Sequence, residues 1–476
     1  MNSLIVLKIL GILLLCESVA MLPAIVVAII YQENTIIAFV ITVAISTVLG
    51  LLFYSIKPKE NMIRYKEGFA IVSFGWILAS IIGALPFLFT GAIPSFVNAF
   101  FESVSGFTTT GATILTNVEV LPYSLLFWRS FTHWLGGMGI LVLALAAGPA
   151  LGVGTFQILK AESPGPISSK LTPKVSGTAK ILYITYLAIT LVEIFLLKLG
   201  GMPLFDSLVH TFGTLGTGGF SIKNASIGAY DSVYFEVVIT IFMILSGVNF
   251  SLYYLAYKNR SLLEFLRDKE FKVYLSIIAI FVVVITFNIN GSVFNSLAQS
   301  LRYATFQVAS IITTTGYGTA NFDLWPDLSR VLLLTLMFIG ACAGSTGGAM
   351  KVIRIHLIFK YVQREISSLI HPRAVRAIKV GDVPIQESVL SSVMAFSMLY
   401  FLLFIGSTLL LLTQNLDIIT AISATAATLG NIGPGLNLVG PSLTYTYLTD
   451  FTKIILSMCM LLGRLELYTI ISLVFP

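Results

Sequence analysis

Long runs of apolar residues, separated by short polar segments, extend over the whole chain. A helix needs about 20 apolar residues to cross a bilayer. Runs of about this length lie near 4–30, 36–56, 68–90, 124–147, 180–199, 232–257, 272–290, 328–359, 388–412 and 451–475. The pattern predicts an all-α integral membrane protein with about ten spans, in which no polar stretch is long enough for a separate soluble domain.

A longer pattern recurs four times after the first two runs. Each unit consists of a span, a short apolar stretch, a loop rich in glycine and threonine, and a second span. The four short stretches cover 94–108, 204–216, 296–313 and 416–429. Apolar segments too short to span often re-enter the membrane. Because each unit crosses twice, it returns to its starting side, so we expect parallel repeats around an axis along the membrane normal.

These units predict the organisation of the chain. We expect an N-terminal transmembrane hairpin followed by four helix–pore-loop–helix repeats with pseudo-fourfold symmetry about a central pore. The predicted boundaries are 1–60 for the hairpin, then 61–150, 151–260, 261–365 and 366–476 for the four repeats, the third with a broken second span.

The four loops carry the candidate chemistry. The segment Thr314-Thr315-Gly316-Tyr317-Gly318 differs at one position from the Thr-Val-Gly-Tyr-Gly filter of potassium channels. In that filter, backbone carbonyls replace the water around an ion. The predicted ion-binding residues are Thr109, Thr110 and Gly111, then Thr217, Gly218 and Gly219, then Thr314, Thr315 and Gly316, and finally Asn431, Ile432 and Gly433. Only the last glycine of each group recurs in all four, so we expect weaker ion discrimination than in a strict potassium channel.

Composition and charge agree with a membrane protein. Only 11% of the residues are charged, against about 25% in soluble domains, and the mean hydropathy is +0.94. The net charge of +6 comes from basic residues concentrated in 57–67, 151–180, 258–272 and 351–387. Positive charge stays on the cytoplasmic side, which places both termini in the cytoplasm and argues against nucleic-acid binding. Acidic residues of the opposite loops, Glu102 among them, predict a mouth that attracts cations.

A glycine-rich segment interrupts the second span of the third repeat. Its candidate gate residues are Gly340, Gly344, Ser345, Thr346, Gly347 and Gly348. Glycine weakens helices, so the segment is either a flexible barrier or, since its glycines recur at every fourth position, a site of close helix packing. Arg464, near the middle of the last apolar run, is the other candidate gate residue, because a central arginine usually faces a cavity.

Other polar residues within the apolar regions give weaker signals. Arg129 and His133 are expected to be interfacial, and His210 to be structural. No intramembrane carboxylate stands out as a coupling site, except Glu466. Motifs of metalloproteases, serine hydrolases and dithiol enzymes are absent, so we expect that the chain is not an enzyme.

Taken together, these residues resemble the Trk/Ktr/HKT superfamily of potassium transporters, and most of all its TrkH-type members. The resemblance covers essentially the whole chain. Its landmarks are 105–112 (SGFTTTGA), 127–130 (FWRS), 134–139 (WLGGMG), 161–166 (AESPGP), 218–221 (GGFS) and 371–374 (HPRA).

The resemblance implies roles for several of these residues. It implies that Gly111, Gly219, Gly316 and Gly433 form a selectivity filter, that 340–348 is an intramembrane loop, and that Arg464 helps to block the pore below the filter. It also implies a homodimer with one pore per subunit and a cytoplasmic regulatory subunit with nucleotide-binding domains. Glycine rather than serine at position 111 favours potassium.

The sequence therefore predicts a potassium-uptake protein of the inner membrane. Potassium is the expected substrate, with rubidium as its analogue, and no covalent cofactor is expected. A proton- or sodium-coupled potassium symporter of the same fold, a weakly selective monovalent-cation channel and a non-conducting scaffold remain as alternatives.

Overall fold

The computed structural model describes residues 2–58, 63–139, 175–371, 377–381 and 383–474. These residues form helices throughout, apart from loops and one short antiparallel pair of strands, β1 (Lys379–Val380) and β2 (Val383–Pro384). The all-helical membrane fold predicted from the apolar runs is therefore confirmed. Residues 161–166 and 372–374 of the landmark motifs, and the 60/61 and 150/151 boundaries, lie outside the described residues.

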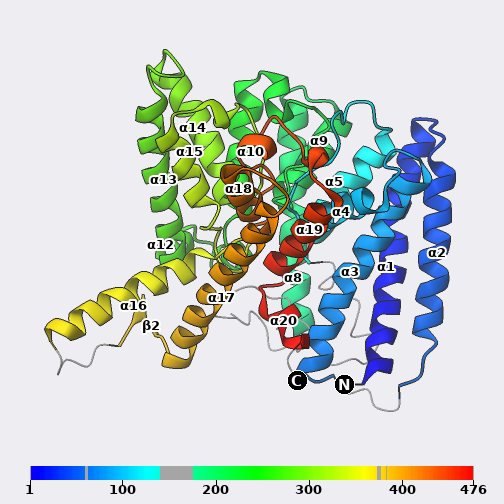
Figure 1. The fold of residues 1–476 in the computed structure, drawn as a ribbon, viewed down its shortest axis with the longest axis horizontal. Helices are drawn as coiled ribbons and strands as arrows, with labels where there is room; N and C mark the ends of the chain where they lie inside the picture. Colours follow the sequence, from blue (N-terminus) through cyan, green and yellow to red (C-terminus); the bar gives the residue numbers. More distant parts are fainter. Residues whose placement is uncertain (1, 59–62, 140–174, 372–376, 382, 475–476) are drawn as a thin grey trace.

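The chain begins with a hairpin of two long apolar helices, α1 (Ser3–Ile30) and α2 (Ile36–Tyr54). The hairpin lies at one edge of the molecule, as Figure 1 shows in dark blue. The N-terminal end of α1 is tied to the start of the first repeat, because the backbone N–H of Asn2 donates to Glu67 (2.8 Å).

The remaining helices follow the order span, short helix, loop, second helix four times. The first helices of the four repeats are α3 (Tyr65–Phe89), α8 (Val175–Leu199), α13 (Lys269–Ile289) and α17 (Glu387–Leu412). The short helices are α4 (Phe96–Phe107), α9 (Leu204–Leu215), α14 (Leu297–Ile312) and α18 (Ile418–Leu429). The second helices begin with α5 (Tyr123–Gly137), α10 (Val233–Ser246), α15 (Asp327–Leu336) and α19 (Asp450–Arg464).

Each short helix runs from the surface into the core. Phe96 at the start of α4 and Ile418 at the start of α18 are exposed, whereas the last residues of both helices are buried. α9 and α14 show the same gradient. The C-terminal ends of all four short helices therefore lie inside the protein, where the negative ends of their dipoles favour a cation.

Three of the second helices are broken. α10 meets α11 (Phe250–Asn259) at 91°, and α19 is followed after a short break by α20 (Tyr468–Val474). The largest break separates α15 from α16 (Val352–Ile370). The interruption predicted at 340–348 is thus present, but it extends from Met337 to Lys351.

The breaks affect the number of recognisable spans. Six described helices are long and apolar enough to cross a membrane, and the bent pair α10–α11 could form a seventh. The other second helices are too short by themselves. The count of ten therefore stays a prediction.

Between α11 and α13 lies the short helix α12 (Leu263–Arg267). The ends of the described chain, near the start of α1 and in α20, both lie at the lower side of Figure 1. The same side holds the start of α3, whose Ser73 donates to the carbonyl of Thr469 (3.4 Å).

Candidate functional site

All four short helices end in the same backbone conformation. The first and the last residue of each predicted group have positive φ, and the pairs are Thr109 and Gly111 (55° and 79°), Thr217 and Gly219 (54° and 75°), Thr314 and Gly316 (60° and 82°), and Asn431 and Gly433 (54° and 99°). A left-handed residue directly after a helix is usually glycine. Threonine in this conformation is strained, and strain of this kind concentrates at functional sites.

Hydrogen bonds back to the helix stabilise this conformation in each loop. In the first loop, the N–H of Thr109 donates to Gly106 (3.1 Å) and the N–H of Thr110 donates to Ser105 (2.9 Å). These are the two bonds of a Schellman motif. The equivalent pairs occur in the other loops, with donors Thr217 and Gly218, Thr314 and Thr315, and Asn431 and Ile432. Each loop is therefore shaped by its own short helix.

The four loops meet in a closed ring. A Cβ atom added to Gly111 would collide with the carbonyl oxygen of Gly218, the residue before the next loop's glycine. The same contact links the other loops. A Cβ atom on Gly219 would meet the carbonyl oxygen of Thr315, one on Gly316 that of Ile432, and one on Gly433 that of Thr110. The repeats thus follow one another around the ring in chain order. Only glycine allows neighbouring backbones to approach this closely.

The structure brings all twelve predicted filter residues together in this ring. Several threonine and asparagine side chains of the loops form hydrogen bonds within a loop or between loops. The hydroxyls of Thr108 and Thr110 lie 2.8 Å apart, as do those of Thr313 and Thr315. Asn431, which departs from the threonine pattern, donates from its amide to Thr110 Oγ1 (2.9 Å) and so joins the fourth loop to the first.

Because the ring consists largely of backbone, its candidate ligands are backbone oxygens. Among the residues that the structure describes, no group of three acidic, histidine or cysteine side chains could hold a metal ion. A cation in this ring would therefore meet carbonyl oxygens and the C-terminal ends of four helices, which suits a weakly hydrated monovalent cation.

The predicted gate residues divide into two sets. Gly347 and Gly348 lie against the ring, where the N–H of Gly348 donates to Thr314 Oγ1 (2.7 Å), whereas the hydroxyl of Thr346 donates to the carbonyl of Ser246 at the end of α10 (3.2 Å). Gly344 lies instead at the α10–α11 bend, where its carbonyl accepts from the N–H of Phe250 (3.0 Å). The hydroxyl of Ser345 donates to the carbonyl of Cys342 (2.6 Å).

Gly340, at the base of the segment, donates to the carbonyl of Met350 (2.7 Å). The close-packing interpretation is wrong, because the glycines at 340, 344 and 348 do not lie on a helix.

Arg464 joins the segment to the ring. Its Nη1 donates to the carbonyl of Thr346 (2.8 Å) and to Thr109 Oγ1 (3.1 Å). Its Nη2 donates to the carbonyls of Gly136 and Gly137 at the end of α5. One guanidinium thus connects the first loop, the interrupted span and two second helices.

Comparison with known proteins identifies the family of this chain. The family model TrkH, described as a cation transport protein, matches residues 31–475. The chain belongs to the TrkH family. It is 39% identical to the Trk system potassium uptake protein TrkH of Halomonas elongata, over 100% of this chain and 99% of the relative. It is 40% identical to the protein of the same name from Escherichia coli K12, over 98% of each chain.

A solved structure agrees with these relatives. The crystal structure of the potassium transporter TrkH from Vibrio parahaemolyticus superposes with a TM-score of 0.90 at 37% identity, covering 100% of this chain and 99% of that one. The resemblance inferred from the loops is therefore confirmed. So is the expectation that the chain is not an enzyme, because the TrkH family consists of transport proteins.

Several predictions about polar residues are wrong. Arg129 and His133 were expected at the interface, but their exposed fractions are 3% and 0%. Glu102 was placed in an acidic mouth, but it is buried in an ion pair with Arg129 (2.6 Å). Two intramembrane carboxylates went unnoticed, Glu17 on α1 and Glu193 on α8, both buried. Burial on a helix that is apolar on all sides leaves no periodic signal.

The sequence reasoning also missed Glu270. This buried residue in the first turn of α13 accepts from the N–H groups of Ala343 (2.7 Å) and Ile353 (3.1 Å). It therefore holds both sides of the interrupted span. In the sequence it looks like an ordinary acidic residue at a helix start. Glu466, the one carboxylate singled out, forms an ion pair with Arg354 of α16 (2.5 Å).

Proposed function

We propose that this protein takes up potassium across the inner membrane through the ring of four glycine loops. The observation that carries the proposal is the closed ring, in which strained threonine or asparagine residues and glycines recur in every repeat. Such backbone can present carbonyl oxygens that replace the water around K⁺. Relatives over the full length are named potassium uptake proteins, which supports potassium as the substrate.

The ion-binding residues in this proposal are the twelve predicted from the sequence, with the four glycines at their centre. Gly340, Gly344, Ser345, Thr346, Gly347, Gly348 and Arg464 form the gate. Support comes from Arg464, which binds the segment and the first loop at once. A cation held there opposes the passage of another cation, so movement of Arg464 and of the segment would open the path.

The proposed organisation keeps the boundaries inferred from the sequence: a hairpin over 1–60 and repeats over 61–150, 151–260, 261–365 and 366–476. The central axis of the repeats would be the pore. Both termini would lie in the cytoplasm, as the basic segments indicate, and the described ends of the chain lie on one side of the molecule.

We also propose a homodimer. α16 projects from the body of the molecule (Figure 1, yellow), with Phe359, Val362, Ile366 and Leu369 exposed along one face. An unpartnered apolar face of this kind suits a second copy of the chain. Leu369→Glu should lower the mass of the purified particle in detergent from dimer to monomer, while Ser368→Glu, on the opposite face, should not. A monomeric wild type would contradict the dimer.

Control by a cytoplasmic nucleotide-binding regulatory subunit rests on the family resemblance alone. Its test is whether a nucleotide-binding protein from the same genome co-purifies with the chain and changes its ion uptake.

A coupled symporter is the second candidate, favoured by one observation. Glu193 on α8 is fully buried in a helix that is long and apolar enough to span, and buried carboxylates in membranes mark proton relays. If uptake is coupled through this residue, Glu193→Gln should abolish the stimulation of uptake by an inward proton gradient. If uptake by the wild type did not depend on the proton gradient, the coupled symporter would be excluded.

The deciding experiment is rubidium-86 uptake into liposomes that contain the purified protein. Competition by potassium far stronger than by sodium is the expected result. Equal competition by both ions would indicate a weakly selective monovalent-cation channel. If Gly316→Ala, with a disrupted ring, took up rubidium as fast as the wild type, the ring would not be the ion path.

A further inference from the structure

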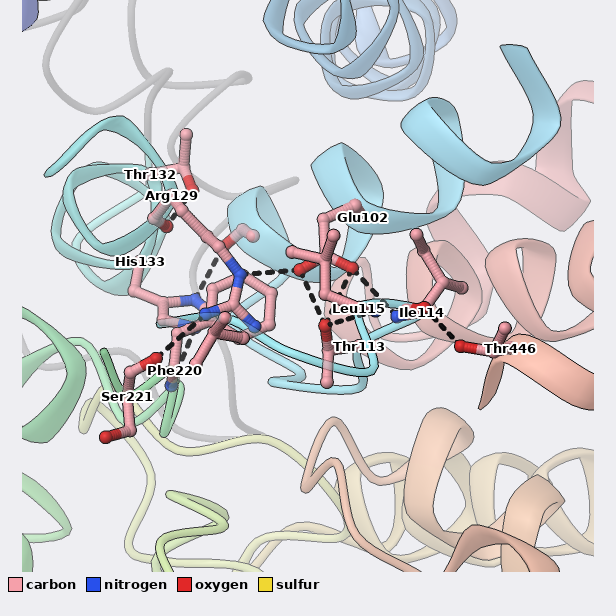
Figure 2. A network of polar contacts seen from close by, with 12 residues as sticks. Glu102, Thr113, Ile114, Leu115, Arg129, Thr132, His133, Phe220, Ser221 and Thr446 are labelled. Carbon is pink, nitrogen blue, oxygen red and sulfur yellow. Dashed lines mark hydrogen bonds and ion pairs between the residues drawn. The ribbon is translucent and has the colours of Figure 1, made fainter. Parts of the chain in front are cut away.

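A buried ion pair with several hydrogen-bond partners lies behind the ring, and the proposed gate does not include it. Figure 2 shows Glu102 of α4 and Arg129 of α5 facing each other, with Nε and Oε1 2.6 Å apart. Both side chains are buried. Burying an ion pair is costly unless further hydrogen bonds satisfy the remaining donors and acceptors. The residues that supply these further hydrogen bonds therefore indicate what the pair holds in place.

Those partners are the residues that follow the first two ring glycines. Glu102 accepts from the hydroxyl of Thr113 (3.0 Å) and from the N–H of Ile114 (3.0 Å), just beyond the first loop. Arg129 donates to the carbonyl of Ser221 (3.0 Å), just beyond the second loop, and its guanidinium lies 3.6 Å from the centre of the Phe220 ring. The pair thus fixes the distance between the exits of two neighbouring loops.

His133, one turn after Arg129, reinforces the same two loops. Its Nδ1 lies 2.8 Å from the carbonyl of Gly106, and its Nε2 accepts from the N–H of Phe220 (3.3 Å). A carbonyl can only accept, so Nδ1 of His133 carries the proton. Because Nε2 accepts a hydrogen bond, the imidazole is neutral. The histidine therefore bridges the first short helix and the second loop.

The network continues to the fourth loop. The N–H of Tyr445 donates to the carbonyl of Thr113 (2.8 Å), and the Tyr445 hydroxyl donates to the carbonyl of Gly433 (2.7 Å). The hydroxyl of Thr446 donates to the carbonyl of Ile114. Through Thr113 and Tyr445, the ion pair is connected to the carbonyl of Gly433 in the ring.

The other repeats lack this charge. The residues nine positions before the ring glycines are Glu102, His210, Gln307 and Ala424. His210 repeats the contact in neutral form, with Nε2 3.1 Å from the Ser221 hydroxyl. Gln307 makes only a long bond to Ala320 (3.5 Å).

Arg129 has no counterpart either. It is the seventh residue of α5, and the seventh residues of α10, α15 and α19 are Ile239, Leu333 and Leu456. The ion pair of Glu102 and Arg129, which we call the brace, therefore occurs only in the first repeat.

From these contacts we infer that Glu102 and Arg129 are positioning residues that set the preference of the ring for potassium over sodium. The inference rests on the proposed potassium path. Neither residue belongs to the ring; they hold the exits of loops one and two apart. Sodium is smaller than potassium, so carbonyls must close in to replace its water. Loops without the brace can close in, which improves the competition by sodium more than that by potassium.

The test is competition with rubidium-86 uptake in liposomes, measured per amount of folded protein. In Glu102→Gln, the ratio of sodium to potassium concentrations that halve uptake should fall roughly tenfold, the loss expected for a hydrogen bond to a charged group. Arg129→Lys should act likewise, because lysine lacks the planar fork that reaches Glu102 and Ser221 together. The double variant Glu102→Gln/Arg129→Gln should add little to either single change.

Glu236→Gln is the matched control. Glu236 of α10, itself buried, forms an equally short ion pair with the partly exposed Arg302 of α14 (2.6 Å), and both hydrogen bonds of this carboxylate go to Arg302 and not to the ring. This variant should lose stability with an unchanged ratio. If Glu102→Gln folds poorly, Thr113→Val removes one hydroxyl while keeping the ion pair, and it should lower the ratio by a smaller factor.

The outcomes separate the inference from the proposed function. A wild type that takes up rubidium selectively, with brace variants that lose flux but keep the wild-type ratio, would show that the pair is only structural. A wild type without preference for potassium would overturn both the proposed selective path and the inference.

Discussion

The glycine loops and the segment 340–348 are both buried backbone without helical structure, but they are held in different ways. Each loop bonds to the last turn of its own short helix, as Thr315 does to Ser310 (2.8 Å). The segment depends on other elements: Cys342 donates to Gly247 (3.0 Å), and Ala343 donates to Glu270. Hydrogen bonds within one element keep its shape when helices shift, whereas hydrogen bonds to other elements change when those elements move. The loops are therefore suited to constant ion binding and the segment to gating.

The largest effect should come from damage to the ring. Gly316→Ala introduces a Cβ at φ +82°, where it would collide with the carbonyl oxygen of Ile432. We expect rubidium uptake to fall to the level of liposomes without protein. Gly318→Ala is the matched control, since its Cβ would meet no atom within 4 Å, and it should keep uptake. Loss of uptake in both variants would mean that crowding in the ring is not the cause.

The next effect should come from the residue that joins the two regions. Arg464→Ala removes the donors to Thr346 and Thr109. Basal uptake should rise roughly tenfold, because a hydrogen bond from a charged group contributes about 1.5–3 kcal/mol. Arg330→Ala on α15, whose ion pairs are with Asp323 and Asp327, should leave uptake unchanged. Unchanged or lower uptake in a well-folded Arg464→Ala would make the residue structural.

A smaller increase in uptake should follow when Glu270, which holds the segment from α13, is weakened as an acceptor. Glu270→Gln keeps the Oε1 atom that accepts from both Ala343 and Ile353 but removes the charge that strengthens these two bonds. Uptake should rise roughly fivefold, less than for Arg464→Ala. Glu264→Gln, in the ion pair with the exposed Arg267 on α12, tests whether any lost carboxylate has this effect, and it should have none. An equal rise in both variants would refute the role of Glu270.

The smallest effect should come from the direct bond between the two regions. Thr314→Val removes the hydroxyl that accepts from Gly348 while keeping the shape of the side chain. Uptake should increase roughly twofold to threefold, consistent with about 1 kcal/mol for a neutral hydrogen bond. Thr314→Ser retains the hydroxyl and should match the wild type. If serine and valine behaved alike, the hydroxyl would not restrain the segment.

The difference between the two regions also explains what could be predicted. The four loops, their order and their twelve residues were accessible from the sequence. A short apolar helix followed by glycine is a local signal, and its fourfold recurrence at similar spacing identifies the repeat. The break in the third repeat was visible for the same reason, because glycine weakens a helix wherever it stands.

The sequence by itself therefore determined the membrane-embedded helices, the repeats and the glycine loops. Only the tertiary structure decided that Glu102 pairs with Arg129, that Arg464 reaches Thr109, 355 residues away, and that Glu270 holds the interrupted span. Local conformation follows from the residues within one turn. A buried charge is defined instead by partners distant in sequence, and an apolar helix surrounded by lipid and protein does not reveal which of its faces will meet them.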